Sequence, residues 1–197
     1  MRITPDGAQI TLIADNTDSE VRFIELSSGR ELRRVKLPDN RLDSLQLAFS
    51  SDGHLLCAGI IDKHFKFFDL TSNKSKELAT TTKEYPQVKF SKDGRLLALS
   101  DSFTVKIWEV STFRELQTLN VPNSGTFAAN ADAFASFSDD GKKIATGGFD
   151  TDTIIWDTET GKQLSKMNGR TNMVQASQGR EKFICSPLSE PKLPLTV

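Results

Sequence analysis

A five-residue turn motif that recurs four times constrains the fold of this sequence more than any other feature. Each copy has an apolar residue, then Ser or Thr, a variable residue, Asp and Gly. The copies span residues 3–7, 49–53, 90–94 and 137–141. Their glycines are 46, 41 and 47 residues apart. Such a period is typical of repeat architectures, and intervals near 40–45 residues indicate four strands in each repeat.

The chemistry of the turn explains its composition. Asp-Gly between two apolar runs favours a hairpin, because Gly accepts a positive φ and Asp tolerates the left-handed region. The preceding Ser or Thr can hydrogen-bond to nearby backbone amides. We therefore expect a tight, internally bonded turn at the start of every repeat, with the large apolar residue anchoring the incoming strand.

Two strand-like runs follow every turn. The first runs are apolar with small residues near their ends, which is typical of strands buried on both faces. They span residues 9–14, 55–59, 96–100 and 143–147. The second runs alternate polar and apolar residues, as half-buried strands do. They span residues 21–26, 65–70, 105–110 and 154–158.

Shorter runs complete each repeat on both sides. Inner strands are predicted at 45–49, 87–90 and 133–137, with only a stub at 2–3 in the first repeat. Outer strands are predicted after a second turn, where runs begin at Glu31, Glu77, Glu115 and Gln163. Charge is tolerated there because an edge strand meets solvent. The sequence thus predicts an all-β fold of four-stranded antiparallel sheets.

A large apolar residue followed by an acid marks the second run of each repeat. These pairs are Ile24-Glu25, Phe68-Asp69, Trp108-Glu109 and Trp156-Asp157. Six residues earlier stand Asp18, Asp62 and Asp150, whereas the third repeat has Ser102 there and Asp101 one place before it. Together with the turn motif, this pattern resembles the WD-repeat family.

The resemblance implies a β-propeller of about four complete blades and a partial fifth. It also implies a divergent set of blades, because none has the Gly-His pair that often precedes the innermost strand in the family. Blade interfaces should therefore depend more on Phe and Ile packing. The residues with implied structural roles in the blades are Asp18, Asp62, Asp101, Asp150, Gly7, Gly53, Gly94, Gly141, Trp108 and Trp156.

The repeats divide the chain into one propeller region and a tail. We predict WD-type repeats over 1–186, with blades at about 1–40, 41–83, 84–122 and 123–170 and a partial blade at 171–186. Residues 187–197 form a Pro-containing C-terminal tail. Three arrangements stay open: an open arc or fragment of a longer propeller, two assembled arcs, and a small closed ring. In the ring, residues 173–176 would supply the inner strand of the first blade.

Charge and composition exclude several classes of function. The 25 Lys and Arg residues balance 26 Asp and Glu, so no basic excess predicts binding to nucleic acid or membranes. No apolar run approaches the roughly 18–20 residues that span a bilayer. The two cysteines, Cys57 and Cys185, are predicted to be buried thiols. We expect a cytoplasmic protein, with the nucleus as the alternative location.

Residues suited to catalysis or to metal and cofactor binding are few. His54 and His64 are predicted to lie in solvated turns. Asp139-Asp140 and Asp150/Asp152 are the best carboxylate clusters, but blade-turn roles explain them better than a calcium site. A basic cluster, Arg33-Arg34 with Lys36, falls on an outer strand. We expect no cofactor, no metal and no catalytic set.

The surface is the remaining candidate for function. The leading hypothesis is a protein-protein interaction scaffold that docks partners on its rim loops within a larger assembly, with self-association through open blade faces. Large side chains in these loops, which suit interface anchors, are Tyr85, Phe103, Phe127 and Arg170. One alternative is an enzyme or ligand-binding propeller whose channel gathers Asp43, Glu84 and Asp132. Another is a truncated fragment of a longer WD-repeat protein.

Overall fold

The computed structural model consists of β-strands and turns, and its described part contains no helix. It describes residues 2–4, 6–13, 20–36, 46–60, 64–69, 72, 74–79, 87–101, 103–122, 133–148, 151–168, 171–176 and 183–187. The chain divides into two compact units, residues 1–85 and 86–197, and each is described by itself.

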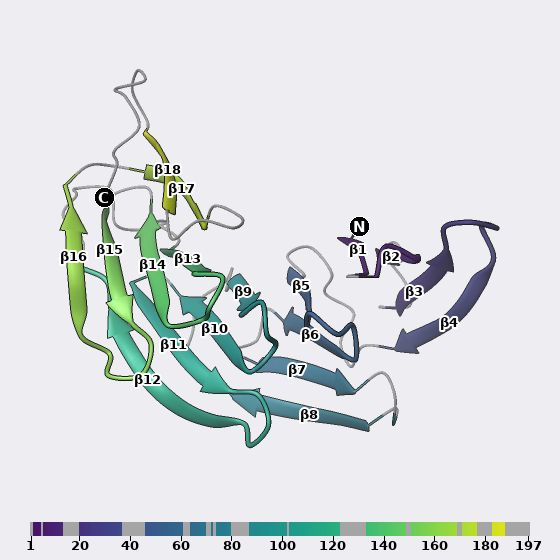
Figure 1. The fold of residues 1–197 in the computed structure, drawn as a ribbon. Helices are drawn as coiled ribbons and strands as arrows, with labels where there is room; N and C mark the ends of the chain where they lie inside the picture. Colours follow the sequence, from purple (N-terminus) through teal and green to yellow (C-terminus); the bar gives the residue numbers. More distant parts are fainter. Residues whose placement is uncertain are drawn as a thin grey trace. The chain divides into compact units, whose positions relative to one another are not determined.

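The first unit holds two four-stranded antiparallel sheets in chain order, which we call blade one and blade two (Figure 1). Blade one consists of β1 (Arg2–Ile3), β2 (Gln9–Ile13), β3 (Glu20–Glu25) and β4 (Glu31–Lys36). Blade two consists of β5 (Gln46–Phe49), β6 (Leu55–Ile60), β7 (His64–Asp69) and β8 (Lys74–Ala79). The Phe23 ring of blade one meets the Phe49 ring of blade two edge-on, with centroids 6.1 Å apart.

The second unit repeats this pattern in blades three and four and adds a two-stranded sheet. Blade three consists of β9 (Gln87–Phe90), β10 (Leu96–Asp101), β11 (Thr104–Glu109) and β12 (Arg114–Asn120). Blade four consists of β13 (Ala133–Phe137), β14 (Lys143–Gly148), β15 (Thr151–Asp157) and β16 (Gln163–Met167). The last sheet pairs β17 (Thr171–Ala176) with β18 (Phe183–Pro187).

The core of the second unit lies between blades three and four. One face of blade three contributes only aliphatic side chains, and the opposed face of blade four contributes aliphatic ones together with the rings of Phe137 and Trp156. The members are Ala98, Val105, Ile107, Leu119, Val121, Ala135, Phe137, Ile144, Ile154 and Trp156. Two sheets that pack face to face are held mainly by this burial of apolar surface. The predicted Phe and Ile packing is present, together with Val, Leu and Trp.

The predicted all-β class and four-stranded antiparallel blades are confirmed, including the stub at β1. Some strand bounds also shift, such as the start of β15 at Thr151 in place of 154. Three further details of the prediction were wrong. His64 is the first residue of β7 and not part of a turn. The outer strand β8 begins at Lys74, three residues before Glu77, because the polar run that precedes Glu77 can still pair along an edge.

The third correction concerns the small closed ring. Blade one has its own inner strand, since β1 pairs with β2. Among the described strands, β17 pairs only with β18. Closure of a ring by residues 173–176 as the inner strand of blade one is therefore not the arrangement observed.

Candidate functional site

The predicted turn is built in the same way in all four blades. Its Ser or Thr hydroxyl donates to the Asp carboxylate over 2.5–2.7 Å, and it accepts from the amide five residues later over 2.9–3.0 Å. The Asp carboxylate accepts from the amide two residues later over 2.9–3.1 Å. The Gly amide donates to the Ser or Thr carbonyl, and every Gly has a φ of 70–73°. The turn is thus closed by its own side chains.

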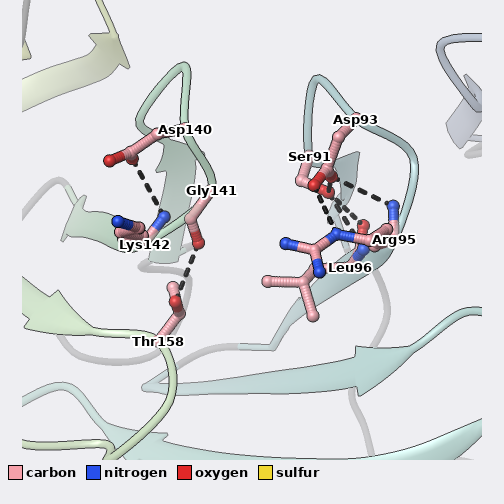
Figure 2. A network of polar contacts seen from close by, with 8 residues as sticks. All are labelled: Ser91, Asp93, Arg95, Leu96, Asp140, Gly141, Lys142 and Thr158. Carbon is pink, nitrogen blue, oxygen red and sulfur yellow. Dashed lines mark hydrogen bonds and ion pairs between the residues drawn. The ribbon is translucent and has the colours of Figure 1, made fainter.

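Figure 2 shows two of these turns, in blades three and four. In blade three, the Ser91 hydroxyl accepts from the Leu96 amide, and Asp93 also forms an ion pair with Arg95 at 2.6 Å. In blade four, the Thr158 hydroxyl donates to the Gly141 carbonyl at 2.8 Å, a buried bond that ties the end of β15 to the turn. The turns therefore fix strand ends.

These hydrogen bonds lower the pKa of the turn carboxyls. For Asp140, the Ser138 hydroxyl is the main cause and the Lys142 amide is the next. For Asp93, burial raises the pKa, but the bonds from Ser91 and Arg95 outweigh it and the net shift is downward. A lowered pKa means that the turn favours the charged carboxylate. A structural role accounts for the shifts without any catalytic one.

The second, outer turns repeat a simpler motif. Ser28, Ser72, Thr112 and Thr160 each donate a hydroxyl hydrogen bond to the acid that follows the Trp position. Blade four has Gly161 here, with a φ of 68°, whereas blade three has Phe113 with a φ of 53°. A bulky residue in the left-handed region is strained. The less typical sequence of this turn therefore places a bulky residue in the same left-handed conformation that Gly29 and Gly161 adopt at this position.

The two tryptophans that mark the repeat are held differently. The indole N–H of Trp156 donates to Thr146 Oγ1 at 2.7 Å within the buried core. Leu99 occupies the position of Thr146 in blade three, five residues after the turn glycine. The indole nitrogen of Trp108 is buried and has no hydrogen-bond partner within the described part of the chain. The Trp156–Thr146 hydrogen bond was not predicted from the sequence. The feature that could have indicated it is a Thr within the otherwise apolar strand β14, two residues before Gly148.

Polar contacts also link blades three and four. The Gln117 side chain donates to the Glu159 carbonyl at 2.6 Å, and the Lys92 ammonium lies 2.9 Å from the Asp139 carboxylate. Lys92 and Asp139 occupy the variable position of their turns. The predicted blade-turn role of the Asp139-Asp140 pair is therefore confirmed in a specific form: Asp140 closes its own turn and Asp139 contacts the neighbouring one.

The predicted basic cluster lies on β4 of blade one. The Arg33 guanidinium stacks 4.3 Å from the centroid of the buried Phe23 ring, and partial burial lowers its pKa. Arg34 forms ion pairs with Glu20 and Glu31. Both arginines thus have partners within their own blade.

Only some of the residues predicted for the rim loops and the blade turns lie in the described part of the chain. Asp101 ends β10 and pairs with Thr104, the first residue of β11. Phe103 lies in the hairpin between these strands, half-buried, and its carbonyl accepts from the Val121 amide at 2.7 Å. The remaining predicted residues lie outside the described ones: Asp18, Asp62, Asp150, Tyr85, Phe127, Arg170, Asp43, Glu84 and Asp132. For Cys57, Cys185 and His64 the strand is described but the side chain is not.

Metal-binding clusters and membrane-spanning helices are both absent from the part of the chain that the structure describes. Among those residues, no three or more His, Cys, Asp or Glu side chains gather in a way that could hold a metal ion. The same residues form no helix that is long and apolar enough to cross a membrane. The best-defined polar constellations are the turn networks and the contacts between blades.

Comparison with known proteins agrees with this geometry. The family model described as "WD domain, G-beta repeat" matches residues 123–157, a range that includes β13, β14 and β15 of blade four. WD repeat-containing protein 82 of Drosophila melanogaster is 30% identical over 189 residues, 88% of this chain and 55% of that protein. WD repeat-containing protein VIP3 of Arabidopsis thaliana is 24% identical, over 66% of this chain and 44% of that protein.

A third relative is named as a component of an assembly. Target of rapamycin complex subunit LST8-1 of Arabidopsis thaliana is 30% identical over 105 residues, 51% of this chain and 33% of that protein. The chain spans about half the length, or less, of these curated relatives.

Proposed function

Because the chain belongs to the WD-repeat family, we propose that it is a protein-interaction scaffold rather than an enzyme. In this proposal, partner proteins dock on the loops at one rim of the blades, within a larger assembly. The observation that carries it is the alignment of 88% of the chain with a WD-repeat relative, together with four blades that share one turn network.

The name of one relative supports an assembly role. The relative with 30% identity over 105 residues is a complex subunit by its name. A scaffold of this kind needs rigid blades and variable loops, since binding residues concentrate on loops that a scaffold positions. The closed turns and the packed face between blades three and four supply such rigidity in the second unit.

Phe103 is the proposed rim anchor whose place is described. It lies between β10 and β11, half-buried, and its carbonyl is fixed by the Val121 amide. A backbone held in this way presents an aromatic side chain at a low entropic cost, which suits an interface anchor. Tyr85, Phe127 and Arg170 complete the proposed set.

Affinity capture from a native extract tests the proposal. The bait is the full chain, and its matched variants are Phe103→Ala and Leu164→Ala. Leu164 lies on the outer strand β16 and is 52% exposed, so its truncation controls for general loss of surface apolarity. We expect a discrete set of proteins that the Phe103→Ala bait recovers at least about fivefold less well, since interface anchors cost more than about 1 kcal/mol when truncated.

Equal recovery by both variants would contradict Phe103 as an anchor, and the absence of any enriched protein would contradict the scaffold role. We also propose a cytoplasmic location, with the nucleus as the alternative, which imaging of a tagged chain would check. Self-association through an open blade face is the remaining part of the proposal.

A further inference from the structure

Every blade turn contains an Asp-Gly pair whose Asp is exposed to solvent. The four acids are Asp6, Asp52, Asp93 and Asp140. Asp-Gly pairs are prone to rearrangement, because glycine has no Cβ to shield its amide nitrogen from the side chain before it. That nitrogen can attack the Asp carboxyl carbon. Burial does not prevent the reaction at these four acids, so any protection of the pair has to come from the bonds of the turn.

The rearrangement produces isoaspartate without any oxidation or reduction. The glycine nitrogen forms a bond to Cγ of the uncharged carboxylic acid, and the acid hydroxyl leaves as water together with the amide proton. A cyclic succinimide results, which water then opens at either carbonyl. Opening at the original backbone carbonyl leaves isoaspartate, in which the chain runs through the side-chain carboxyl group and is longer by one methylene.

The hydrogen bonds of the turn in blade four oppose this reaction at both reacting groups. The Ser138 hydroxyl and the Lys142 amide donate to Asp140 Oδ1 over 2.7 and 3.0 Å, and Figure 2 shows the second bond. Such bonds favour the ionised carboxylate, which has no hydroxyl that can leave as water. The Gly141 amide donates to the Ser138 carbonyl at 2.9 Å, and this bond has to break before the nitrogen attacks.

The other three blades have the same protection. Their hydroxyl groups donate to the Asp carboxylate over 2.5–2.6 Å, and their glycine amides donate to the Ser or Thr carbonyl at 2.9 Å. Blade one uses Thr4 where the others use Ser, so the hydroxyl is the shared feature. We propose that this hydroxyl protects the Asp-Gly pair of its turn from rearrangement, and that Asp140 becomes an isoaspartate site when the Ser138 hydroxyl is lost.

Isoaspartate at position 140 would affect more than its own turn. The added methylene would displace the carboxyl group from the Ser138 hydroxyl and shift Gly141 relative to β14. The Gly141 carbonyl accepts the buried hydrogen bond from Thr158 at 2.8 Å, which ties the end of β15 to the turn. One rearranged residue would therefore weaken the connection between two strands of blade four.

Peptide mapping by mass spectrometry tests the proposal on the full folded chain, incubated in warm, mildly acidic buffer. Ser138→Ala should speed up isoaspartate formation at Asp140 by at least about fivefold, a factor that corresponds to one ordinary hydrogen bond. Asp93 of the same molecules should keep its wild-type rate, which distinguishes a local effect from general unfolding. Ser138→Thr is the matched control and should leave the rate at Asp140 unchanged, because Thr4 already fills this position in blade one.

The turn of blade three provides a second arm. Ser91→Ala removes the hydroxyl that donates to Asp93 at 2.6 Å, so it should speed up rearrangement at Asp93 and leave Asp140 unchanged. The wild-type chain unfolded in urea gives the rate without protection. All four Asp-Gly pairs should rearrange faster there than in the folded chain, and at similar rates.

Three results would overturn the proposal. The first is a folded wild-type chain whose Asp-Gly pairs rearrange as fast as in urea. The second is an equal rate at Asp140 in Ser138→Ala and Ser138→Thr. The third is an acceleration at all four pairs when one hydroxyl is removed, which would assign the protection to the fold as a whole. If Ser138→Ala does not fold, Ser91→Ala and the comparison with urea still decide.

Discussion

Blades three and four have the same order and antiparallel pairing of strands, but their tryptophans have different hydrogen-bond partners. In blade four, Thr146 accepts from the Trp156 indole, whereas blade three has Leu99 at the same position and an unpaired Trp108 indole nitrogen in the described part of the chain. Both tryptophans follow a buried or half-buried Ile. The fold of a blade therefore depends on its strand pairing, its turn and its apolar face. The tryptophan hydrogen bond is not required, because only blade four forms it among the described residues.

The outer turns differ in the same manner. Gly161 of blade four occupies the left-handed region and lies against the Gln117 side chain of blade three. Phe113 of blade three adopts the left-handed region without being glycine. Each difference changes side chains around an unchanged backbone pattern, which explains how the repeats diverge in sequence and still form equivalent sheets.

The largest expected effect concerns the face that the two blades share. Ile107 and Ile155 each precede the Trp of their blade, but Ile107 is fully buried between the blades and Ile155 is half-buried. Ile107→Ala should lower the free energy of unfolding by about 2–5 kcal/mol through lost burial and a cavity. Ile155→Ala should cost clearly less. Urea denaturation measures both, and equal losses would show that the shared core is not the dominant interface.

The tryptophan bond is expected to have the next largest effect. Thr146→Val keeps the shape but removes the acceptor, which leaves the Trp156 indole unpaired, as the Trp108 indole is among the described residues. A cost of about 1–3 kcal/mol is expected for an orphaned buried donor. Thr146→Ser retains the hydroxyl and is the control. If the two variants lose the same free energy of unfolding, the methyl group and not the hydrogen bond stabilises blade four.

Gly161 offers a sharper test of how the blades fit together. Gly161→Ala should cost about 1–2 kcal/mol for its positive φ alone. An additional cost is expected because an added Cβ would lie 2.6 Å from Gln117 Oε1. Gly29→Ala, at the same turn position in blade one, meets nothing within 4 Å and serves as the control for φ.

The excess cost of Gly161→Ala over Gly29→Ala should disappear in a Gln117→Ala background. A double-mutant cycle measured by urea denaturation isolates this term. An excess that persists without the Gln117 side chain would place its origin in blade four itself.

Much of the fold could be predicted because its signals are local. The Asp-Gly turns and the alternating runs at 105–110 and 154–158 indicate strands that the structure confirms as β11 and β15. Contacts between blades could not be predicted, since Lys92–Asp139 and Gln117–Glu159 depend on how far one sheet is offset from the next. The start of β8 could not be predicted either, because the polar residues at its beginning are also typical of a turn.

The candidate site was only partly accessible to sequence reasoning. The turn carboxylates were recognised, because Asp-Gly has a definite stereochemical cause. The Trp108 indole, which has no partner among the described residues, was not recognised. Its state depends on Leu99, which stands two residues beyond Leu97, the direct cross-strand partner of Trp108, and this neighbour is known only once the register is known. Phe103 was selected for its loop position, and its role stays a prediction.

The smallest effect concerns the turn carboxyls of the two blades. The pKa of Asp140 is lowered mainly by the Ser138 hydroxyl, whereas Asp93 has an ion pair with Arg95 in addition to its Ser91 bond. Because both pKa values are lowered, these groups stabilise the fold fully above the ordinary Asp value of 3.8. Their contribution is lost as the pH falls through the folded-state values.

Salt should separate the two turns, because it screens ion pairs more than short hydrogen bonds. Raising the ionic strength from about 0.01 M to about 1 M should raise the pKa of Asp93 more than that of Asp140. Ser138→Ala should raise the pKa of Asp140 at any salt concentration. Carbon NMR titration of the two carboxyls measures both effects. An equal salt response in the two turns would mean that Arg95 affects the charge state of Asp93 no more than Lys142 and Lys143 affect that of Asp140.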